Sequence, residues 1–185
     1  MAKAATGTGK ANVLGALNKA RSMELLAIHQ YMNQHYNVDN MDYGELAAQI
    51  KLIAIDEMRH AEQFADRIEE LGGEPTSDLA AAVIKGQDIG AVFVFDANLE
   101  DDTIATYNQL LLVCRENGDS TSMKLFETII DEEQEHFTYF DNIKEHIKNL
   151  DGTYLARIAG TPSSTGLQPQ GFVIRKAAGT PPAGA

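Results

Sequence analysis

The sequence predicts an all-α protein built around a bundle of four long helices. All five prolines lie at residue 75 or beyond, and the stretches 1–74 and 76–161 contain none. Proline is the residue that most strongly interrupts a helix, so both stretches can form long helices. Apolar residues recur in them at intervals of three and four, which is typical of a helix with one buried face. Turn-forming residues divide these stretches into four segments of similar length.

The four segments end where glycine, asparagine and aspartate cluster, at 37–40, 71–75 and 116–119. Such clusters are typical of turns and helix ends. We therefore expect helices over 10–37, 42–71, 88–116 and 119–150. A short fifth helix is expected over 152–159, with three apolar residues on one side: Tyr154, Leu155 and Ile158.

The link between the second and third helices is long, about 16 residues from Gly72 to Gln87. Adjacent helices of an up-and-down bundle need only about 2 to 8 connecting residues. A crossover along a bundle of about 35 Å needs roughly 11 extended residues. The length of the link therefore favours two helical hairpins whose turns lie at opposite ends of the bundle.

The chain of 185 residues is long enough for one domain with its own core. We expect this domain to occupy 1–160 and a C-terminal tail to occupy 161–185. The tail is rich in glycine, proline, serine and threonine, a composition typical of disorder. Within it, the apolar run Phe172, Val173 and Ile174 is the segment that could anchor it to the domain.

Charge and cysteine content narrow the functional classes. The formal net charge of −12 disfavours nucleic acids and anionic membranes as partners, and it suits attraction of cations. A single cysteine, Cys114, excludes an internal disulfide and fits a reducing compartment. No apolar run approaches the roughly 18 residues of a membrane-spanning helix. The sequence therefore predicts a cytoplasmic protein without a membrane segment.

An internal repeat relates the two halves of the chain. A shift of 76 residues superimposes seven identical pairs, and within each helix the paired residues share one face. The pairs are Glu24 and Glu100, Ile28 and Ile104, Tyr31 and Tyr107, Ile53 and Ile129, Glu57 and Glu133, His60 and His136, and Phe64 and Phe140. In each half the two glutamates are 33 residues apart around a predicted turn, so they face each other in the hairpin.

Six polar residues of this repeat occupy core-facing positions: Glu24, Glu57, His60, Glu100, Glu133 and His136. Each could instead be a solvated glutamate or a hydrogen-bonded core histidine, but the matched levels of all six argue against that reading. Protonated carboxylates that hydrogen-bond one another remain an alternative, which a pH titration without metal would test. Buried carboxylates need neutralisation, and two divalent cations would supply it. Mixed carboxylate and imidazole ligands suit iron or manganese better than calcium or structural zinc.

Two motifs give this ligand set a specific resemblance. They are Glu57-Met58-Arg59-His60 and Glu133-Gln134-Glu135-His136, accompanied by NKARSMELLAIHQY at 18–31 and IDEMRHAEQFADRI at 55–68. Over about 10–160 the chain resembles the bacterioferritins of the ferritin-like di-iron carboxylate superfamily, whose paired Glu-x-x-His ligand set is well described. Rubrerythrins carry a cysteine-rich segment that this chain lacks, the ribonucleotide reductase small subunit is much longer, and animal-type ferritins lack the second histidine.

The resemblance implies a ferritin-like four-helix bundle with a di-iron site whose ligands are also the catalytic residues. By this resemblance Glu24 and His60 bind one iron, Glu100 and His136 bind the other, and Glu57 and Glu133 bridge them. Tyr31 and Tyr107 resemble hydrogen-bond donors behind the ligands, although bundle tyrosines often serve packing alone.

Met58 follows a predicted ligand by one residue, so it points about 100° away from the core. The pattern alone favours an apolar contact between subunits. By the resemblance, Met58 would be an axial ligand of a haem, or a related iron porphyrin, shared between two subunits.

The resemblance implies an iron-storage ferroxidase. It would oxidise Fe²⁺ with O₂ or H₂O₂ and store the mineral inside a hollow homo-oligomer of 24 subunits, with a redox partner protein for iron release. Two alternatives stay open: a rubrerythrin-like di-iron peroxidase, and a haem or metal carrier that stores no mineral. The native size and the visible spectrum would discriminate among them.

Overall fold

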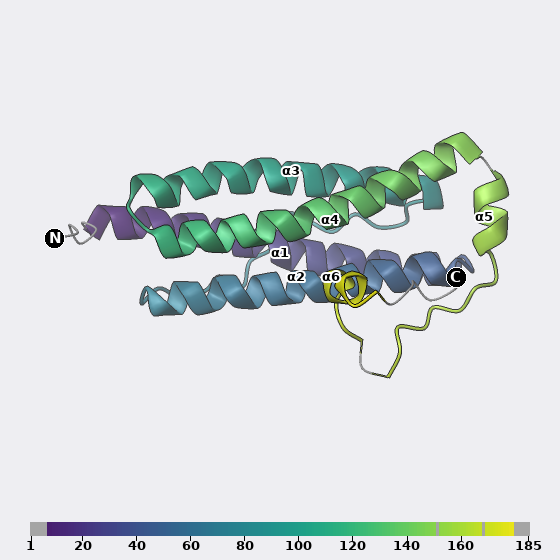
Figure 1. The fold of residues 1–185 in the computed structure, drawn as a ribbon, viewed down its shortest axis with the longest axis horizontal. Coiled ribbons are helices and arrows are strands. Elements are labelled where there is room, and N and C mark those ends of the chain that lie inside the picture. The colour runs from purple at the N-terminus through teal and green to yellow at the C-terminus, as the bar shows by residue number, and fades with distance from the viewer. Residues whose placement is uncertain (1–6, 151, 168, 180–185) are drawn as a thin grey trace.

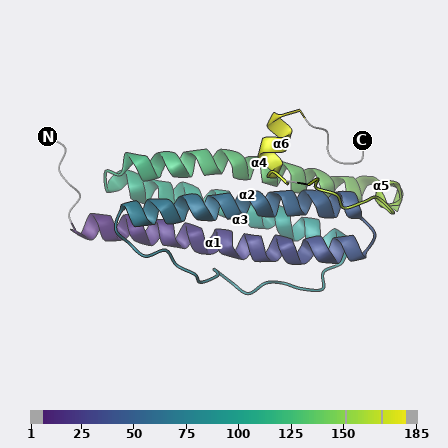
Figure 2. The ribbon, with the colours of Figure 1, turned by 90° about the horizontal axis from the view of Figure 1, so that it is seen from below.

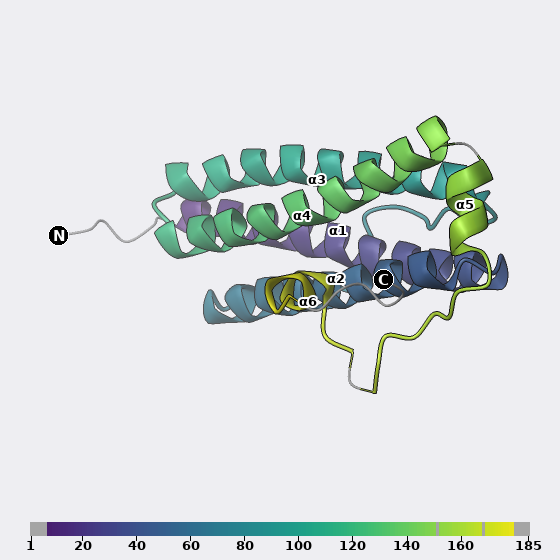
Figure 3. The same ribbon diagram turned by 45° about the vertical axis from the view of Figure 1, so that its right-hand side comes forward.

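The computed structural model describes residues 7–150, 152–167 and 169–179, and four long helices form its body (Figure 1). The described helices are α1 Gly7–Asn40, α2 Gly44–Glu70, α3 Ile89–Glu116, α4 Ser120–Leu150, α5 Gly152–Ile158 and α6 Phe172–Ala177. These bounds confirm the four predicted helices and the short fifth one. Helix α5 lies across one end of the bundle, and α6 lies against the side formed by α2 and α4 (Figure 3).

Each hairpin turn contains one residue with a left-handed backbone. Asp42 between α1 and α2 has φ 67°, and Gly118 between α3 and α4 has φ 73°. Glycine adopts this conformation without steric cost because it lacks a Cβ atom. Asp119 then begins α4 by accepting a hydrogen bond of 3.0 Å from the Ser122 amide. The two turns lie at opposite ends of the bundle, as the sequence predicted (Figure 1).

The crossover between α2 and α3 runs along α1 for most of the length of the bundle (Figure 2). Gln30 of α1 donates to the Ile84 carbonyl at 2.9 Å and accepts from the Ile84 amide at 2.8 Å. The Ala80 amide donates to the Ser22 carbonyl at 2.9 Å. This confirms the predicted long crossover and shows that α1 supplies its backbone partners.

The apolar core consists of two clusters separated by a polar level. The first cluster, towards α5, includes Tyr31, Ile50, Phe93 and Phe140. The second, towards the other end, includes Leu17, Phe64, Tyr107 and Phe126. In every long helix the six predicted ligands lie between the two clusters, so apolar packing above and below holds the polar level in place.

The beginning of the C-terminal segment is attached at the α1–α2 turn. Thr161 pairs with Tyr43 in an isolated parallel bridge, and its side chain accepts from the Glu45 amide at 2.9 Å. A Cβ atom on Gly44 would collide with the backbone at 161–163, so glycine permits this close approach. Farther on, Phe172 packs on the first core cluster, as predicted, whereas Ile174 is exposed and was wrongly predicted to be an anchor.

Within the part of the chain that the structure describes, no helix combines the length and the apolar character that crossing a membrane requires.

Candidate metal centre

All six predicted ligands converge at the polar level of the bundle, and every one of them is buried. They form two groups that share two glutamates, and in each group the four ligand atoms lie within 4.8 Å of one another. The groups are Glu24, Glu57, His60 and Glu133, and Glu57, Glu100, Glu133 and His136. The internal repeat is therefore a structural repeat: each hairpin contributes the same set of donors.

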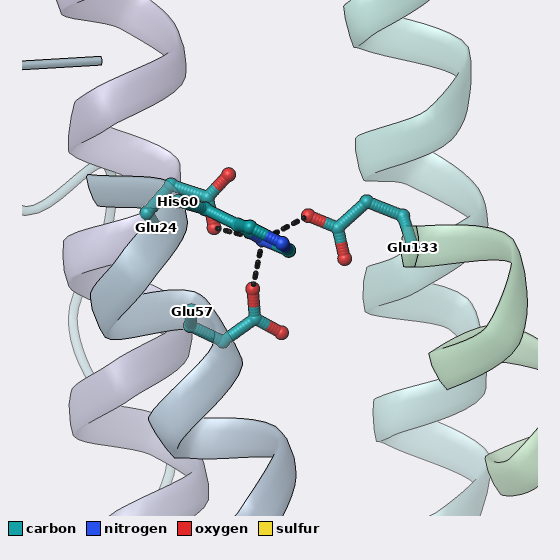
Figure 4. Close-up of side chains that lie close together, drawn as sticks. All are labelled: Glu24, Glu57, His60 and Glu133. Atoms are coloured by element: carbon teal, nitrogen blue, oxygen red, sulfur yellow. Dashed lines mark hydrogen bonds and ion pairs between the residues drawn. The ribbon is translucent and has the colours of Figure 1, made fainter. Parts of the chain in front are cut away.

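The first group is arranged around the Nδ1 atom of His60 (Figure 4). This nitrogen lies 3.1 Å from Oε2 of Glu57, 3.1 Å from Oε1 of Glu133 and 3.8 Å from Oε2 of Glu24. Helices α1, α2 and α4 thus all supply donors to one point. A metal ion replacing the central hydrogen bonds would meet three carboxylates and one imidazole.

The second group repeats this arrangement around the Nδ1 atom of His136. It lies 3.1 Å from Oε2 of Glu133, 3.2 Å from Oε1 of Glu57 and 4.0 Å from Oε1 of Glu100. The Oε1 atoms of Glu57 and Glu133 are buried, and although each lies close to a histidine Nδ1, neither has a contact with hydrogen-bond geometry among the described residues. Such buried oxygens need a partner. Two cations bridged by these carboxylates would supply one for each oxygen.

The two predicted tyrosines contact the ligand set across the hairpins. Tyr31 of α1 donates to Oε1 of Glu100 at 2.5 Å, and Tyr107 of α3 donates to Oε1 of Glu24. Both tyrosines are fully buried. The other oxygen of Glu24, Oε2, faces His60, whereas in Glu100 the Oε1 atom that accepts from Tyr31 is also the one that faces His136.

In the metal-free cluster, the carboxylates and imidazoles share protons. Burial, together with the nearby Glu133 carboxylate, raises the pKa of Glu24 and of Glu100 well above the usual value. Burial alone would lower the pKa of the histidines, but the surrounding carboxylates outweigh it and raise the pKa of both His60 and His136. Burial would raise the pKa of Glu133, but the two imidazoles hold it below its usual range. The cluster therefore holds protons where divalent cations would otherwise sit.

Two carboxylates that the sequence analysis did not single out contact the outer nitrogens of the histidines. Oε2 of Glu132 lies 3.1 Å from Nε2 of His60, and Oδ2 of Asp56 lies 3.5 Å from Nε2 of His136. The second separation is that of an ion pair rather than a hydrogen bond. The repeat contained a signal for both, since an acidic residue directly precedes the glutamate of each Glu-x-x-His motif. Outer partners of this kind orient a metal-binding imidazole.

The donor set fits a pair of transition-metal ions. Carboxylates and imidazoles without thiolates suit iron or manganese, and two such ions would balance the four glutamates. Two imidazoles are more than calcium or magnesium sites ordinarily contain. The structure thus provides a di-metal carboxylate centre inside a four-helix bundle, with both histidines directed at it through Nδ1.

Met58 lies away from this centre. Its side chain is 48% exposed on α2, and its neighbour Glu57 faces the core. The outward direction predicted from the sequence is confirmed. A half-exposed thioether fits either an apolar contact with a second subunit or an axial ligand to a porphyrin at such a contact, because neutral sulfur can serve both.

A bundle with a long crossover and a paired Glu-x-x-His centre defines the class of ferritin-like di-metal carboxylate proteins. The family model of the ferritin-like domain matches residues 14–151. The bacterioferritin of Desulfovibrio desulfuricans is 63% identical over 164 residues, which cover 89% of this chain and 92% of the relative. The chain therefore belongs to the bacterioferritins.

Solved structures agree with this assignment. The X-ray structure of the Desulfovibrio desulfuricans bacterioferritin, described with its diiron site in different catalytic states, superimposes with a TM-score of 0.86 at 62% identity. That match covers 89% of this chain and 96% of the other. The Mycobacterium tuberculosis bacterioferritin has a TM-score of 0.75 at 35% identity over 80% of this chain and 93% of its own.

Proposed function

We propose that the six buried residues of the polar level bind two Fe²⁺ ions as substrate, and that this bacterioferritin acts through them as an iron-storage ferroxidase. The observation that carries the proposal is the sharing of Glu57 and Glu133 between two complete donor groups. Glu24 with His60 would hold one ion, and Glu100 with His136 the other. Two Fe²⁺ ions together can give two electrons to one molecule of O₂ or H₂O₂, which a single ion cannot.

The protein's own groups prepare the site by giving up protons. Glu24, Glu100 and both histidines have raised pKa values in the metal-free cluster, so each must lose a proton before it can bind a cation. The hydrogen bonds from Tyr31 and Tyr107 support the carboxylate forms of Glu100 and Glu24. The two apolar clusters exclude bulk water from both ends of the site.

Mixing metal-free protein with Fe²⁺ in air tests this assignment. We expect rapid formation of Fe³⁺ with the unchanged chain and at least a tenfold slower reaction in Glu133→Ala and in His136→Ala. The loss of Glu133 disrupts both donor groups, and the loss of His136 disrupts one of them. Glu127→Ala is the matched control, because Glu127 is exposed on the same helix as both ligands. Circular dichroism verifies that each variant is folded. Unchanged rates in both ligand variants would refute the assignment.

The porphyrin is a second part of the proposal, supported by the half-exposed position of Met58 on the outer face of α2. Met58 of each of two subunits would hold one shared haem or related iron porphyrin, which gives half a porphyrin per chain. A neutral thioether favours Fe²⁺ over Fe³⁺, so such a group would accept electrons readily and could pass them to the mineral from a redox partner protein. Met58→Leu should lose the Soret band and keep iron oxidation. Normal porphyrin content in Met58→Leu would restrict Met58 to packing.

Storage requires a hollow oligomer, and we propose 24 subunits of 20.2 kDa, about 480 kDa in total. Gel filtration and iron content per particle separate this from the alternatives. A rubrerythrin-like peroxidase would consume H₂O₂ without retaining iron, and a carrier would be small and form no mineral. We place the protein in the cytoplasm, which cell fractionation can test.

A further inference from the structure

The two halves of the metal centre differ in what surrounds the outer nitrogen of each histidine. The repeat makes Asp56 and Glu132 equivalent, since each precedes a bridging glutamate. The side chain of Asp56 is only 1% exposed, whereas that of Glu132 is 32% exposed. The C-terminal segment, which has no counterpart in the repeat, contacts Asp56 directly.

Residues 171–173 cover Asp56. The Val173 amide donates to Oδ2 of Asp56 at 3.0 Å, and this is the oxygen that faces His136. Arg59 donates to Oδ1 of the same carboxylate at 3.0 Å. Gly171 lies so close that a Cβ atom there would overlap the Asp56 carboxylate. Asp56 is therefore held between the bundle and the backbone of the segment.

Phe172 closes the same side with its ring. Its centroid lies 6.1 Å from that of His136, edge to face, and 5.1 Å from that of Tyr139. Lys176, one turn farther along α6, forms an ion pair with Glu135 of α4. The segment is thus fixed to α2 through a carboxylate and to α4 through an aromatic cluster and an ion pair, and His136 lies beneath it.

On the His60 half the same segment borders a cavity and leaves the neighbouring carboxylate partly exposed. Glu132, which contacts His60 Nε2, also lines a cavity of about 470 Å³ between α4 and α6. The other lining residues are Asp131, Glu135, Val173, Lys176 and Ala177. Its volume is many times the roughly 30 Å³ that each water molecule around a hydrated cation occupies. Solvent therefore reaches the carboxylate next to His60 but not the one next to His136.

We propose that the C-terminal segment 171–177 makes the two metal positions kinetically unequal: it encloses the His136 position and leaves the His60 position to exchange metal past Glu132. This inference rests on the proposed metal ligands and adds to them the order in which the two positions fill and empty. Asp56 acts as a positioning residue, since it reaches the metal only through His136.

The segment is separable from the bundle. The family match ends at residue 151, before the segment begins. The Mycobacterium tuberculosis relative aligns with this chain over 155 residues, which are 98% of the relative and 83% of this chain. A bundle of this kind therefore forms with a shorter chain. A truncated variant is therefore expected to fold, and circular dichroism and native size verify that it does.

Release of Co²⁺ tests the inference without any oxidation chemistry. Metal-free protein is loaded anaerobically with two Co²⁺ per chain, mixed with excess chelator, and followed by the visible absorption of the bound ion. We expect two phases of equal amplitude that differ at least tenfold in rate. His136→Ala should lack the slow phase, and His60→Ala should lack the fast one.

Two changes should abolish the difference in rate. A chain that ends at Pro169 loses the cover, and Gly171→Ala pushes it away from Asp56; in both, the slow phase should approach the fast one. The matched controls are a chain that ends at Gly179 and Gly152→Ala, where an added Cβ atom meets nothing within 4 Å. Both controls should keep two phases.

Three results would overturn the inference: one phase in the full chain, a slow phase that truncation at Pro169 leaves unchanged, or a slow phase that survives in His136→Ala. Each of these leaves the proposed ligands intact if two Co²⁺ ions still bind. A full chain that binds no Co²⁺ would instead overturn the proposed function and this inference together.

Discussion

Tyr107 on α3 donates its phenolic hydrogen to Glu24 on α1, although the two residues are 83 positions apart in the sequence. The repeat supplies the reciprocal bond from Tyr31 on α1 to Glu100 on α3. Each hairpin therefore supports the glutamate of the other hairpin. The metal centre and the packing of the two hairpins depend on the same pair of bonds, so the site cannot loosen without the bundle loosening at that level.

Removing one of these donors should weaken metal binding more than it weakens the fold. Tyr107→Phe keeps the ring packed against Phe64 and Phe126 but leaves Glu24 without its donor. Loss of an outer hydrogen bond typically costs 10- to 100-fold in metal affinity, and we expect about tenfold for Co²⁺ by titration. Tyr36→Phe, on the exposed face of α1, is the control. Equal affinities in the two variants would mean that Tyr107 serves packing alone.

Metal binding should release protons, and affinity should rise with pH. Burial and neighbouring carboxylates raise the pKa of Glu24 and Glu100, and those carboxylates also raise the pKa of His60 and His136. All four groups bind metal only after deprotonation, so lowering the pH strengthens the competing proton. Calorimetric titration with Co²⁺ in two buffers of different ionisation enthalpy measures the release. His60→Gln should release fewer protons, and identical heats in both buffers would contradict the prediction.

Asp96 should make the protein less stable at high pH. Its side chain is fully buried on α3, where Oδ1 accepts from Gln34 at 2.7 Å and Oδ2 has no partner among the described residues. Burial raises its pKa well above 3.8. The unfolded chain then loses this proton at lower pH than the folded one, so stability falls as pH rises from the unfolded pKa towards the folded pKa. Above the folded pKa, the loss of stability is about 1.4 kcal/mol for each unit by which the folded pKa exceeds the unfolded pKa.

Urea unfolding of the metal-free protein at pH 5 and pH 8 measures this effect. Asp96→Asn removes the ionisation, so its free energy of unfolding should fall less between the two pH values than that of the unchanged chain. Asp102→Asn is the control, because Asp102 is exposed on the same helix. The same decline in Asp96→Asn as in the unchanged chain would show that Asp96 ionises without cost in its buried position.

Helical period, turns and the repeat were enough to predict the four long helices, the crossover and the convergence of the six donors. The pairing of each tyrosine with the opposite hairpin was not predicted, because the repeat places the donors at one level without showing that α1 and α3 contact each other there. Asp56 and Glu132 could have been found, since each directly precedes a motif glutamate. The position of α6 depends on the fit of Gly171 against Asp56, a tertiary contact that leaves no period in the sequence.

Arg67 should be important for stability but not for metal binding. Its guanidinium donates to both carboxylate oxygens of Asp119 at 2.8 and 2.9 Å, and to Ser122 at 2.9 Å. The two charged side chains are only 16% and 14% exposed, so this contact between α2 and the start of α4 is poorly screened by water. Breaking it leaves Asp119 without its charged partner and weakens the residue that begins α4.

We expect Arg67→Ala to lower the free energy of unfolding in urea by about 1 to 3 kcal/mol. Arg67→Lys should recover only part of this loss, because one ammonium nitrogen cannot replace both Nη2, which contacts Asp119, and Nε, which donates to Ser122. Arg115→Ala, exposed near the end of α3, should change stability little. All three variants should bind Co²⁺ as the unchanged chain does, since the second apolar cluster separates Arg67 from the metal centre. If Arg67→Ala leaves the free energy of unfolding unchanged, the ion pair in the folded protein is no more favourable than the hydration of the two charges in the unfolded chain.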